Sequence, residues 1–252
     1  GLKVKGRINI QYVASKGKIY VLEVNPRASR TVPFLSKVTG VPVANIAMQC
    51  ILGKKLKELG FTKDIADVGN FVSVKVPVFS FQKLKDVDTT LGPEMKSTGE
   101  VMGSDENLEK SLYKGLISSG IKVKDQGSVL FTISGTAKEE AYGLAKRFSD
   151  LGYHIMATKG TARYFEEKGL RVETVGKIEE EGKYEHDVLG LIYKGLVDMV
   201  INTAAKKKTA RNDGFKIRRA ASEQEIACLT SLDTTDALLK VLESISFNVS
   251  SI

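Results

Sequence analysis

From Ser128 onward, short apolar runs alternate with amphipathic segments, and this alternation constrains the fold more than any other feature of the sequence. Each run with strand character is followed by a segment with apolar residues at helical spacing. Strands and helices that alternate in this way form a parallel sheet with helices on both faces, so the sequence predicts an α/β domain. The predicted strands are 129–133, 153–157, 170–175, 198–202 and 226–230, and the predicted helices are 136–151, 162–168, 186–194, 213–221 and 235–246.

One strand-to-helix turn in this half, Ala157-Thr158-Lys159-Gly160-Thr161-Ala162, has the composition of an anion site. It offers two hydroxyls, one ammonium and one glycine beside the free backbone amides of a helix start. A threonine before a helix is also typical of simple capping, so the six residues alone fit a capped helix as well. Further polar residues fall just past predicted strand ends, where ligands gather in such sheets, and they favour a phosphate site. These residues are Ser134, Lys177, Asn202, Thr203, Asp233 and Thr234.

The chain opens with a predicted hairpin whose strands cover residues 7–13 and 19–24. Side chains alternate along a strand, so Asn9 and Gln11 share one face of the first strand, and Glu23 and Asn25 share one face of the second. Together they form a cluster of oxygen ligands with a single carboxylate. Hard cations such as Mg²⁺ prefer oxygen ligands of this kind and usually share them with substrate phosphates. The same pattern in isolation is also typical of a polar hairpin face in water.

Composition excludes several classes of function. The net charge of +8 suits acidic small ligands or an acidic partner surface, and without Trp or basic runs interleaved with aromatics we expect no nucleic-acid partner. The two cysteines have no His or Cys at ligand spacing, which fits a reducing cytoplasm. No apolar stretch is long enough for a membrane span and we expect no signal peptide or membrane partner. The start at Gly1, close to a strand, is typical of a piece of a longer polypeptide.

Residues 22–34 closely resemble the end of the second ATP-grasp module of the carbamoyl-phosphate synthase large chain. Their sequence is Leu-Glu-Val-Asn-Pro-Arg-Ala-Ser-Arg-Thr-Val-Pro-Phe. The resemblance continues through residues 36–42 and returns in the string from Gly92 to Gly103. It implies ATP as a substrate and Mg²⁺ or Mn²⁺ ions that bridge the ATP phosphates. The metal-holding residues it implies are Gln11, Glu23 and Asn25, and it places Arg27, as a catalytic residue, near the transferred phosphoryl group.

Residues 128–252 resemble the methylglyoxal-synthase-like domain, the C-terminal regulatory domain of the same large chain, through the turn at 157–162 and through Ile201-Asn202-Thr203. The resemblance implies a three-layer, Rossmann-like domain that binds a nucleotide monophosphate, with UMP the typical inhibitor and IMP a candidate activator. Ala204 stands where some members carry a threonine, which leaves the nucleotide preference open. The residues implied for the phosphate are Lys138, Thr158, Thr161 and Lys177, and those implied for the ribose and base are Asn202 and Thr203.

The reaction implied by the resemblance makes carbamoyl phosphate from bicarbonate, ammonia released from glutamine, and two ATP, for pyrimidine and arginine biosynthesis. The implied partners are the remainder of the large chain and the small glutaminase subunit, with a homo-oligomer left open. The adenine pocket and the phosphate-covering loop lie upstream in the family and are missing from this sequence. Because positioning supplies most of the rate of phosphoryl transfer, we predict that this chain alone is inactive. Val76 replaces a carboxylate that helps hold ornithine in ornithine-activated members, which argues against ornithine regulation.

We expect three parts in the chain: the C-terminal part of an ATP-grasp α+β module (1–103), a helix and linker (104–127), and the methylglyoxal-synthase-like allosteric domain (128–252). The helix of the second part is predicted from Ser104, as its cap, to Gly120. A capping box is predicted at Thr136–Glu139, at the start of the first long helix of the third part.

Two other functions stay open from the sequence. One is a free-standing nucleotide-sensing module without catalysis of its own. The other, less favoured, is methylglyoxal synthase, whose chemistry needs a general base. Asp187 and Asp233 are the available carboxylates, and neither lies in a matching motif.

Overall fold

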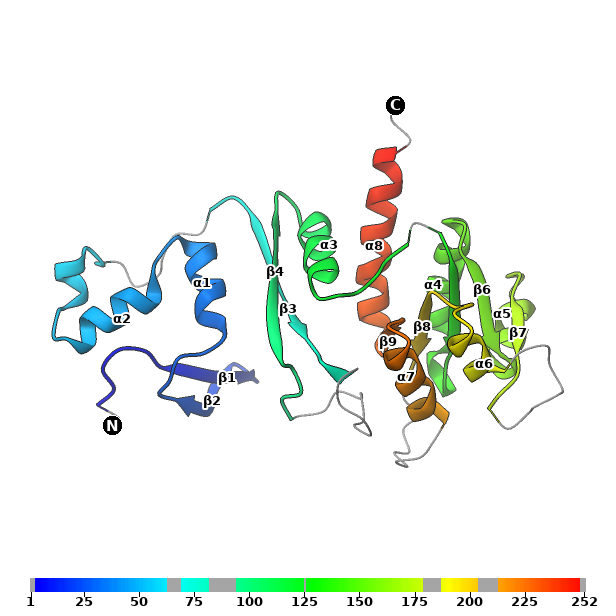
Figure 1. Ribbon diagram of the computed structural model, residues 1–252, viewed down its shortest axis with the longest axis horizontal. Helices are drawn as coiled ribbons and strands as arrows, with labels where there is room; N and C mark the ends of the chain where they lie inside the picture. The colour runs from blue at the N-terminus through cyan, green and yellow to red at the C-terminus, as the bar shows by residue number, and fades with distance from the viewer. Residues whose placement is uncertain are drawn as a thin grey trace.

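The structure is a computed structural model that describes residues 3–62, 69–81, 94–124, 126–178, 187–203 and 213–249, with side chains up to Ser244 in the last helix. Three groups of elements follow one another along the long axis of Figure 1: a hairpin with short helices, a two-stranded sheet with one helix, and a larger sheet covered by helices. Ala204, His186, and the Gly92-Pro93 pair of the second matching string lie outside the described residues.

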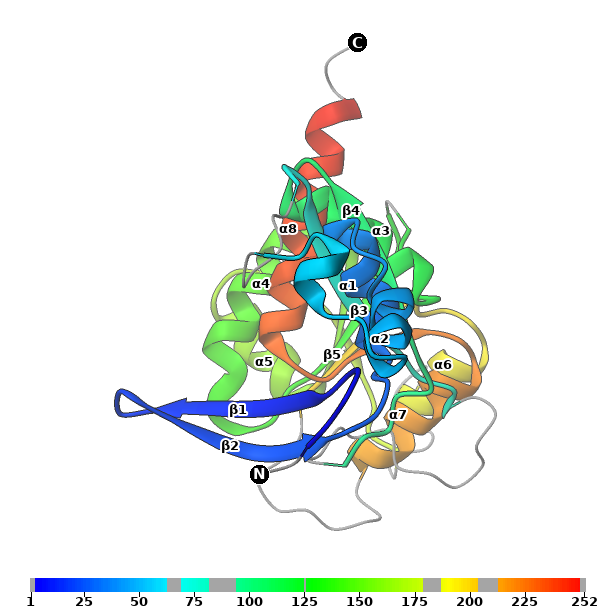
Figure 2. The same cartoon turned by 90° about the vertical axis from the view of Figure 1, so that its left-hand side faces the viewer.

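The hairpin consists of β1 (Asn9–Ser15) and β2 (Lys18–Asn25), which pair antiparallel as predicted. The register sets Gln11 opposite Glu23, and a bulge follows directly after Gln11. Its apolar side chains are widely exposed, and its turn end extends beyond the rest of the chain in Figure 2. The hairpin leads into α1 (Thr31–Thr39), α2 (Val43–Ile51) and the 3₁₀ helix η1 (Leu56–Leu59).

Helix α1 was not predicted from the sequence, although its residues lie within the matching string. Pro33 stands in its first turn, where a missing N–H costs nothing, and Gly40 ends it with a φ of 68°. Among the described residues, no single helix is both long and apolar enough to cross a membrane. Helices α1 and α2 together have the length and apolar composition of a membrane span, but the chain bends by 109° between them.

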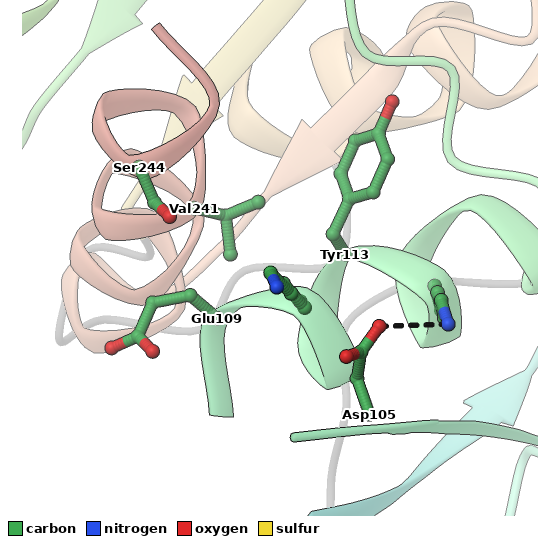
Figure 3. A pocket seen from close by; sticks show the side chains of 7 residues that line it. Asp105, Glu109, Tyr113, Val241 and Ser244 are labelled. Atoms are coloured by element: carbon green, nitrogen blue, oxygen red, sulfur yellow. Dashed lines mark ion pairs between the residues drawn. The ribbon is translucent and has the colours of Figure 1, made fainter. Parts of the chain in front are cut away.

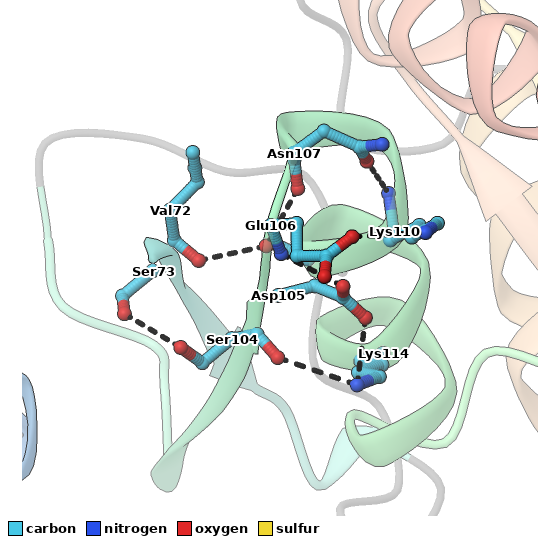
Figure 4. Close-up of polar contacts among 9 residues, drawn as sticks. Val72, Ser73, Ser104, Asp105, Glu106, Asn107, Lys110 and Lys114 are labelled. Carbon is cyan, nitrogen blue, oxygen red and sulfur yellow. Dashed lines mark hydrogen bonds and ion pairs between the residues drawn. The ribbon is translucent and has the colours of Figure 1, made fainter. Parts of the chain in front are cut away.

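The middle of the chain is a two-stranded antiparallel sheet, β3 (Val72–Val78) and β4 (Gly99–Asp105), covered by α3 (Leu108–Ser118). Gly103 lets α3 approach β4 closely, because a Cβ there would lie 1.9 Å from the carbonyl oxygen of Ser111. Ser111 itself is fully buried, and its hydroxyl lies 2.7 Å from the carbonyl oxygen of Val72 on β3 (Figure 4).

The prediction that Ser104 caps α3 is wrong. Ser104 lies in β4, where its hydroxyl is 3.0 Å from that of Ser73 on β3, because pairing with β3 carries the strand on to Asp105 (Figure 4). Asn107 is the cap, and its Oδ1 accepts a 2.9 Å hydrogen bond from the backbone N–H of Lys110.

The remaining strands form one parallel sheet with the order β7-β6-β5-β8-β9, so the predicted α/β fold is confirmed. Its strands are β5 (Ser128–Thr132), β6 (His154–Thr158), β7 (Glu173–Val175), β8 (Met199–Asn202) and β9 (Ala227–Leu229). Its helical segments are η3 (Gly135–Ala137), α4 (Lys138–Asp150), α5 (Lys159–Glu167), α6 (Val188–Tyr193), α7 (Asp213–Glu223) and α8 (Leu232–Val249).

Two hydrophobic layers cover this sheet, because neighbouring residues of a strand point to opposite faces. Phe131 packs with residues of α4, α5 and α8, including an edge-on contact with Phe165 at 5.6 Å between ring centroids. Leu130 packs on the other face with residues of α6 and α7, including Leu191 and Ile217. All five of these side chains are at most 3% exposed, so both faces of the sheet are close-packed.

The capping box predicted at Thr136–Glu139 is also wrong. The 3₁₀ segment η3 occupies these positions up to Ala137, which precedes α4 without a side-chain cap. The carboxylate of Glu139 accepts hydrogen bonds from Tyr164 and Lys168 on and after α5 instead. A tertiary contact between two helices therefore replaces the local capping bond.

Helix α3 also packs against α8, so it touches both the two-stranded and the five-stranded sheet units. A small cavity of about 110 Å³ lies between the two helices, lined by residues that include Tyr113, Lys114, Val241 and Ser244 (Figure 3). Lys114 is paired with Asp105 at 2.7 Å and Lys110 with Glu106 at 3.6 Å, so both lysines that line the cavity already have a carboxylate partner. The division of the chain at residues 103 and 127 stays a prediction.

The segment entering β5 is held at the amino edge of the sheet by Asp198. Its carboxylate accepts a 2.8 Å hydrogen bond from the backbone N–H of Ser128 and pairs with Lys124. Burial acts to raise the pKa of Asp198, but the bonds from Lys124 and Ser128 outweigh it and hold the pKa below its ordinary value of 3.8.

We expect Asp198→Asn to destabilise the chain at neutral pH but not in acid. A folded-state pKa below 3.8 means that the carboxylate contributes stability above that pH, and the contribution is lost as the pH falls through the folded-state value. Urea unfolding of both proteins at pH 6 and pH 3 measures this. The gap in unfolding free energy between wild type and variant should shrink at pH 3, and an equal gap at both pH values would contradict the assignment.

Candidate functional site

The hairpin brings its three predicted metal ligands together. Nε2 of Gln11 donates to Oε1 of Glu23 at 2.6 Å, and Nδ2 of Asn25 donates to the same oxygen at 2.7 Å. An amide can present its oxygen in place of its NH₂ group by a half-turn about its last side-chain bond. The cluster can then offer a cation two amide oxygens and one carboxylate, which is the donor set of a hard cation that takes its remaining ligands from phosphate or water.

One carboxylate is a small charge for a metal site. Among the described residues, no group of three or more His, Cys, Asp and Glu side chains could hold a metal ion. Glu23 and Gln11 are exposed and Asn25 is half-buried, so the cluster is open to a ligand. The cluster therefore suits a cation that binds together with an anionic ligand, and not a tightly held structural metal ion.

The arginines that follow the hairpin donate to backbone carbonyls outside this cluster. Nη1 of Arg27 donates to the carbonyl oxygen of Ala28 at 3.1 Å, and its side chain is exposed. Nη1 of Arg30 donates to the carbonyl oxygen of Ser97 at 2.8 Å. Arg30 thus joins the two sequence strings on which the resemblance rests, while the role of Arg27 at a phosphoryl group stays a prediction.

At the carboxyl edge of the five-stranded sheet, β6 passes into α5 without a loop. Thr158 ends the strand and stands before the first helical residue in extended conformation, with φ −65° and ψ 146°. Its side chain makes no capping hydrogen bond, so the simple capping interpretation does not describe it. Lys159, Gly160 and Thr161 form the first turn of α5, and the backbone N–H groups of a first turn have no partner within their helix.

A second cation reaches the same turn from α4. Nζ of Lys138, the first residue of α4, donates to the carbonyl oxygen of Gly160 at 2.6 Å. Lys177 is exposed two residues past β7, the strand beside β6 in the sheet. The carboxyl edge therefore carries a half-buried hydroxyl, two ammonium groups on neighbouring segments and the start of a helix, which together suit a phosphate monoester.

Two of the predicted contact residues also brace the framework of this edge. Thr161 is 1% exposed, and its hydroxyl lies 3.3 Å from both the backbone nitrogen and the carbonyl oxygen of Ile133. Oγ1 of Thr203 accepts a 3.1 Å hydrogen bond from the backbone N–H of Ser134. These bonds tie α5 and the end of β8 to the end of β5, and a ligand role for either hydroxyl stays a prediction.

Asn202 is the most constrained of the predicted residues, with 2% exposure at the end of β8. Its Nδ2 donates to Oγ1 of Thr132 at 2.7 Å, and its Oδ1 accepts from Nη1 of Arg218 at 2.7 Å. Sequence reasoning missed Arg218, which lies on α7 and is 6% exposed. The sequence did contain one indication that Arg218 is buried: it lies between Ile217 and Ala221, on the inward face of an amphipathic helix.

The candidate bases for methylglyoxal synthase chemistry are placed at helix starts. Oδ1 of Asp187 accepts a 2.5 Å hydrogen bond from the backbone N–H of Gly190, which makes it the cap of α6. Asp233 lies in the first turn of α8. Capping gives Asp187 a structural role, and this geometry favours neither carboxylate as a general base.

Comparison with known proteins finds two family descriptions on this chain. Residues 140–230 match the MGS-like domain, and residues 1–59 match the carbamoyl-phosphate synthase L chain, ATP binding domain. Among solved structures, one titled "Crystal structure of ForH" is 20% identical over 47% of this chain and 78% of that chain, with a TM-score of 0.34, too low to establish a shared fold.

The two family matches divide the candidate residues between them. The ATP-binding match contains the hairpin cluster and Arg27, and the MGS-like match contains the start of α5, Lys177 and the end of β8. Lys138 lies two residues before the second match. One chain carries both domain types in this order, and the two matches are those of the C-terminal part of a carbamoyl-phosphate synthase large subunit.

Proposed function

We propose that this chain serves a carbamoyl-phosphate synthase, a ligase that makes carbamoyl phosphate from bicarbonate, ammonia and ATP. In this proposal it contributes the metal-holding edge of an ATP site and a regulatory site for a nucleotide monophosphate such as UMP or IMP. Its partners are the rest of a large chain and a glutaminase subunit. The observation that carries the proposal is the presence of both matched domain types on one chain, and the hydrogen-bonded cluster of the hairpin and the contact of Lys138 with Gly160 support it.

For the ATP site, the support is the convergence of Gln11 and Asn25 on one oxygen of Glu23. A Mg²⁺ or Mn²⁺ ion held there would bridge the ATP phosphates and neutralise charge that develops during phosphoryl transfer. Arg27 follows the cluster by two residues and supplies a cation for the transferred group in the same proposal. In this proposal the hairpin forms one wall of the ATP-binding cleft. The opposite wall would cover the exposed faces of β1 and β2.

For the regulatory site, the support is the set of cations and hydroxyls at the carboxyl edge of the parallel sheet. Regulation requires that the nucleotide bind one conformation better than another. Helix α8 packs on the sheet and on α3, and α3 packs on β3 and β4, so packed elements connect the parallel-sheet unit with the two-stranded sheet. Beyond that sheet, Nζ of Lys75 on β3 donates to Oγ1 of Thr31 on α1, and Arg30 donates to the carbonyl of Ser97, so hydrogen bonds continue the proposed coupling to the ATP-binding match.

Calorimetric titration of the chain with UMP, IMP and inorganic phosphate tests the regulatory site. We expect saturable binding of UMP or IMP, and we expect Thr158→Ala to weaken it about tenfold, because a hydrogen bond to a charged group is worth about 1.5 kcal/mol. Thr39→Ala removes a hydroxyl that donates to the carbonyl of Leu35 inside α1 and serves as the control. If none of the three ligands binds to the wild type, the regulatory part of the proposal is wrong.

Two activity assays test the enzyme assignment. We expect this chain alone to show no turnover with ATP, bicarbonate and ammonia, because a half site cannot position ATP against its nucleophile. Steady turnover in that assay would refute this expectation. Turnover of dihydroxyacetone phosphate would instead establish methylglyoxal synthase activity, and its rate in Asp187→Asn and Asp233→Asn would identify the base.

A further inference from the structure

The first two residues of α4 hold opposite ends of α5. Nζ of Lys138 donates to the carbonyl oxygen of Gly160, in the first turn of α5, at 2.6 Å. The carboxylate of the next residue, Glu139, accepts hydrogen bonds from the hydroxyl of Tyr164 and from Nζ of Lys168, in and just after the last turn of the same helix. Two neighbouring side chains of opposite charge therefore attach the start of α4 along the length of α5.

Lys168 is the centre of the second attachment. Its Nζ lies 5.1 Å from the ring centroid of Tyr142 and 5.2 Å from that of Tyr164, within the range of a cation–π contact. The hydroxyl of Tyr142, on α4, donates to the backbone carbonyl of Lys168 at 3.0 Å. The bond from Lys168, and after it the bond from Tyr164, hold the pKa of Glu139 below its ordinary value of 4.5, so this carboxylate is charged at neutral pH. The contact therefore joins α4 and α5 at several points.

The start of α4 has no side-chain cap. Ala137 stands before it, and the first backbone N–H groups of a helix have no partner within the helix, so an uncapped start frays more readily. The 3₁₀ segment η3, which precedes α4, begins without a side-chain cap as well. Lys138 and Glu139 both lie in this first turn, so the contact that one side chain makes with α5 also restrains the backbone that carries the other.

We propose that Glu139 is a positioning residue for the anion site: by attaching the start of α4 to α5, it keeps Lys138 beside the first turn of α5. This inference rests on the proposed function and adds the contact that holds one of the two cations of that site in place. Charge alone predicts the opposite effect, because a carboxylate one residue away from Lys138 repels a phosphate dianion. The sign of the change in affinity therefore distinguishes positioning from electrostatics.

Calorimetric titration with UMP and with inorganic phosphate tests this role in Glu139→Ala. We expect both ligands to bind at least threefold more weakly than to wild type, because the first turn of α4 then opens more often and carries Lys138 away from the anion. Glu140→Ala is the matched control, since it removes the same charge from the next, exposed position of the same turn. It should leave both affinities unchanged or raise them less than twofold.

Dependence on Lys138 is the result that a merely structural role would not produce. In the Lys138→Ala background, Glu139→Ala should change the affinity for either ligand less than twofold, because the cation that it positions is already gone. Equal weakening with and without Lys138 would overturn the inference. An affinity of Glu139→Ala equal to or above that of wild type would overturn it as well.

Tyr164→Phe keeps the test decisive if Glu139→Ala fails to fold. It removes the hydroxyl that donates to Glu139 and leaves every charge and both rings in place. We expect it to weaken both ligands about twofold, and only where Lys138 is present; unchanged binding would contradict the inference. A wild type that binds neither nucleotide nor phosphate contradicts the proposed function, whereas a wild type that binds them while Glu139→Ala and Glu140→Ala behave alike contradicts this inference alone.

Discussion

Gly103→Ala is expected to separate α3 from β4 and to lower the free energy of unfolding by about 3 kcal/mol or more. The added Cβ would lie 1.9 Å from the carbonyl oxygen of Ser111 and 2.5 Å from the backbone nitrogen of Gly115. Both atoms belong to the backbone of α3, so no side-chain rotation can relieve the overlap. The helix must move, and the buried hydroxyl of Ser111 then loses its contact with the carbonyl of Val72.

Gly99→Ala provides the control on the same strand. A Cβ at Gly99 would meet Cβ of Val78 at 3.7 Å, an ordinary van der Waals contact, so its effect should stay within about 0.5 kcal/mol. Urea unfolding of the two variants and the wild type measures the difference. Equal stability of the two variants would show that α3 does not approach β4 as closely as the structure places it.

The same substitution tests the connection between the two halves of the chain. Helix α3 packs on β3, β4 and α8, so its displacement should also increase local opening of α8, which loses part of its packing. Hydrogen exchange of the backbone amides of α8 measures that loosening. Unchanged protection of α8 in Gly103→Ala would mean that the parallel-sheet unit is stable without α3.

The α/β fold could be predicted from the sequence because its pattern is local and repeated. Buried parallel strands are short and apolar, and their helices carry apolar residues at helical spacing, so each strand-helix pair indicates the next. The predicted strand 153–157 and the observed β6 differ by one residue at each end. Helix α1 has only nine residues, and Pro33 lies in its first turn, so the sequence gives it a weaker helix signal than the longer helices of the parallel-sheet unit.

The two wrong caps have a common cause. Ser104 and the Thr136–Glu139 segment both have capping chemistry, but each takes part in a tertiary contact that sequence periodicity does not contain. Ser104 is held in β4 by pairing with β3, and Glu139 is drawn to Tyr164 and Lys168. Neither predicted cap forms, because the tertiary contacts outweigh a single capping bond, although α3 still begins at a local cap, Asn107.

The two candidate sites also differ in how far the sequence could predict them. The hairpin cluster could be predicted because strand alternation and a short turn fix which residues meet, and Gln11 does face Glu23. At the carboxyl edge, the sequence indicated which residues follow the strands but not what their side chains contact. The bonds of Thr161 to Ile133 and of Asn202 to Arg218 join segments far apart in the chain, which only the packed structure brings together.

Lys138→Ala combined with Lys177→Ala is expected to weaken binding of UMP and of inorganic phosphate a hundredfold or more. Each lysine supplies a charge-assisted contact to a phosphate dianion, and the loss of one such contact typically costs tenfold or more in affinity. Lys138 already lies at the first turn of α5, and Lys177 follows the strand beside β6. Calorimetry with both ligands measures the effect, and the double variant should reduce phosphate and nucleotide binding by the same factor.

Lys146→Ala combined with Lys240→Ala is the matched control, because it changes the net charge equally on the exposed surfaces of α4 and α8. Long-range attraction alone would make the two double variants equivalent, whereas direct contact with the phosphate confines the loss to Lys138 and Lys177. Raising the salt concentration from 50 to 500 mM should weaken binding more in the wild type than in the Lys138/Lys177 variant. Binding within threefold of wild type in that variant would show that the anion is held elsewhere, and the assignment of this edge as a phosphate site would then be wrong.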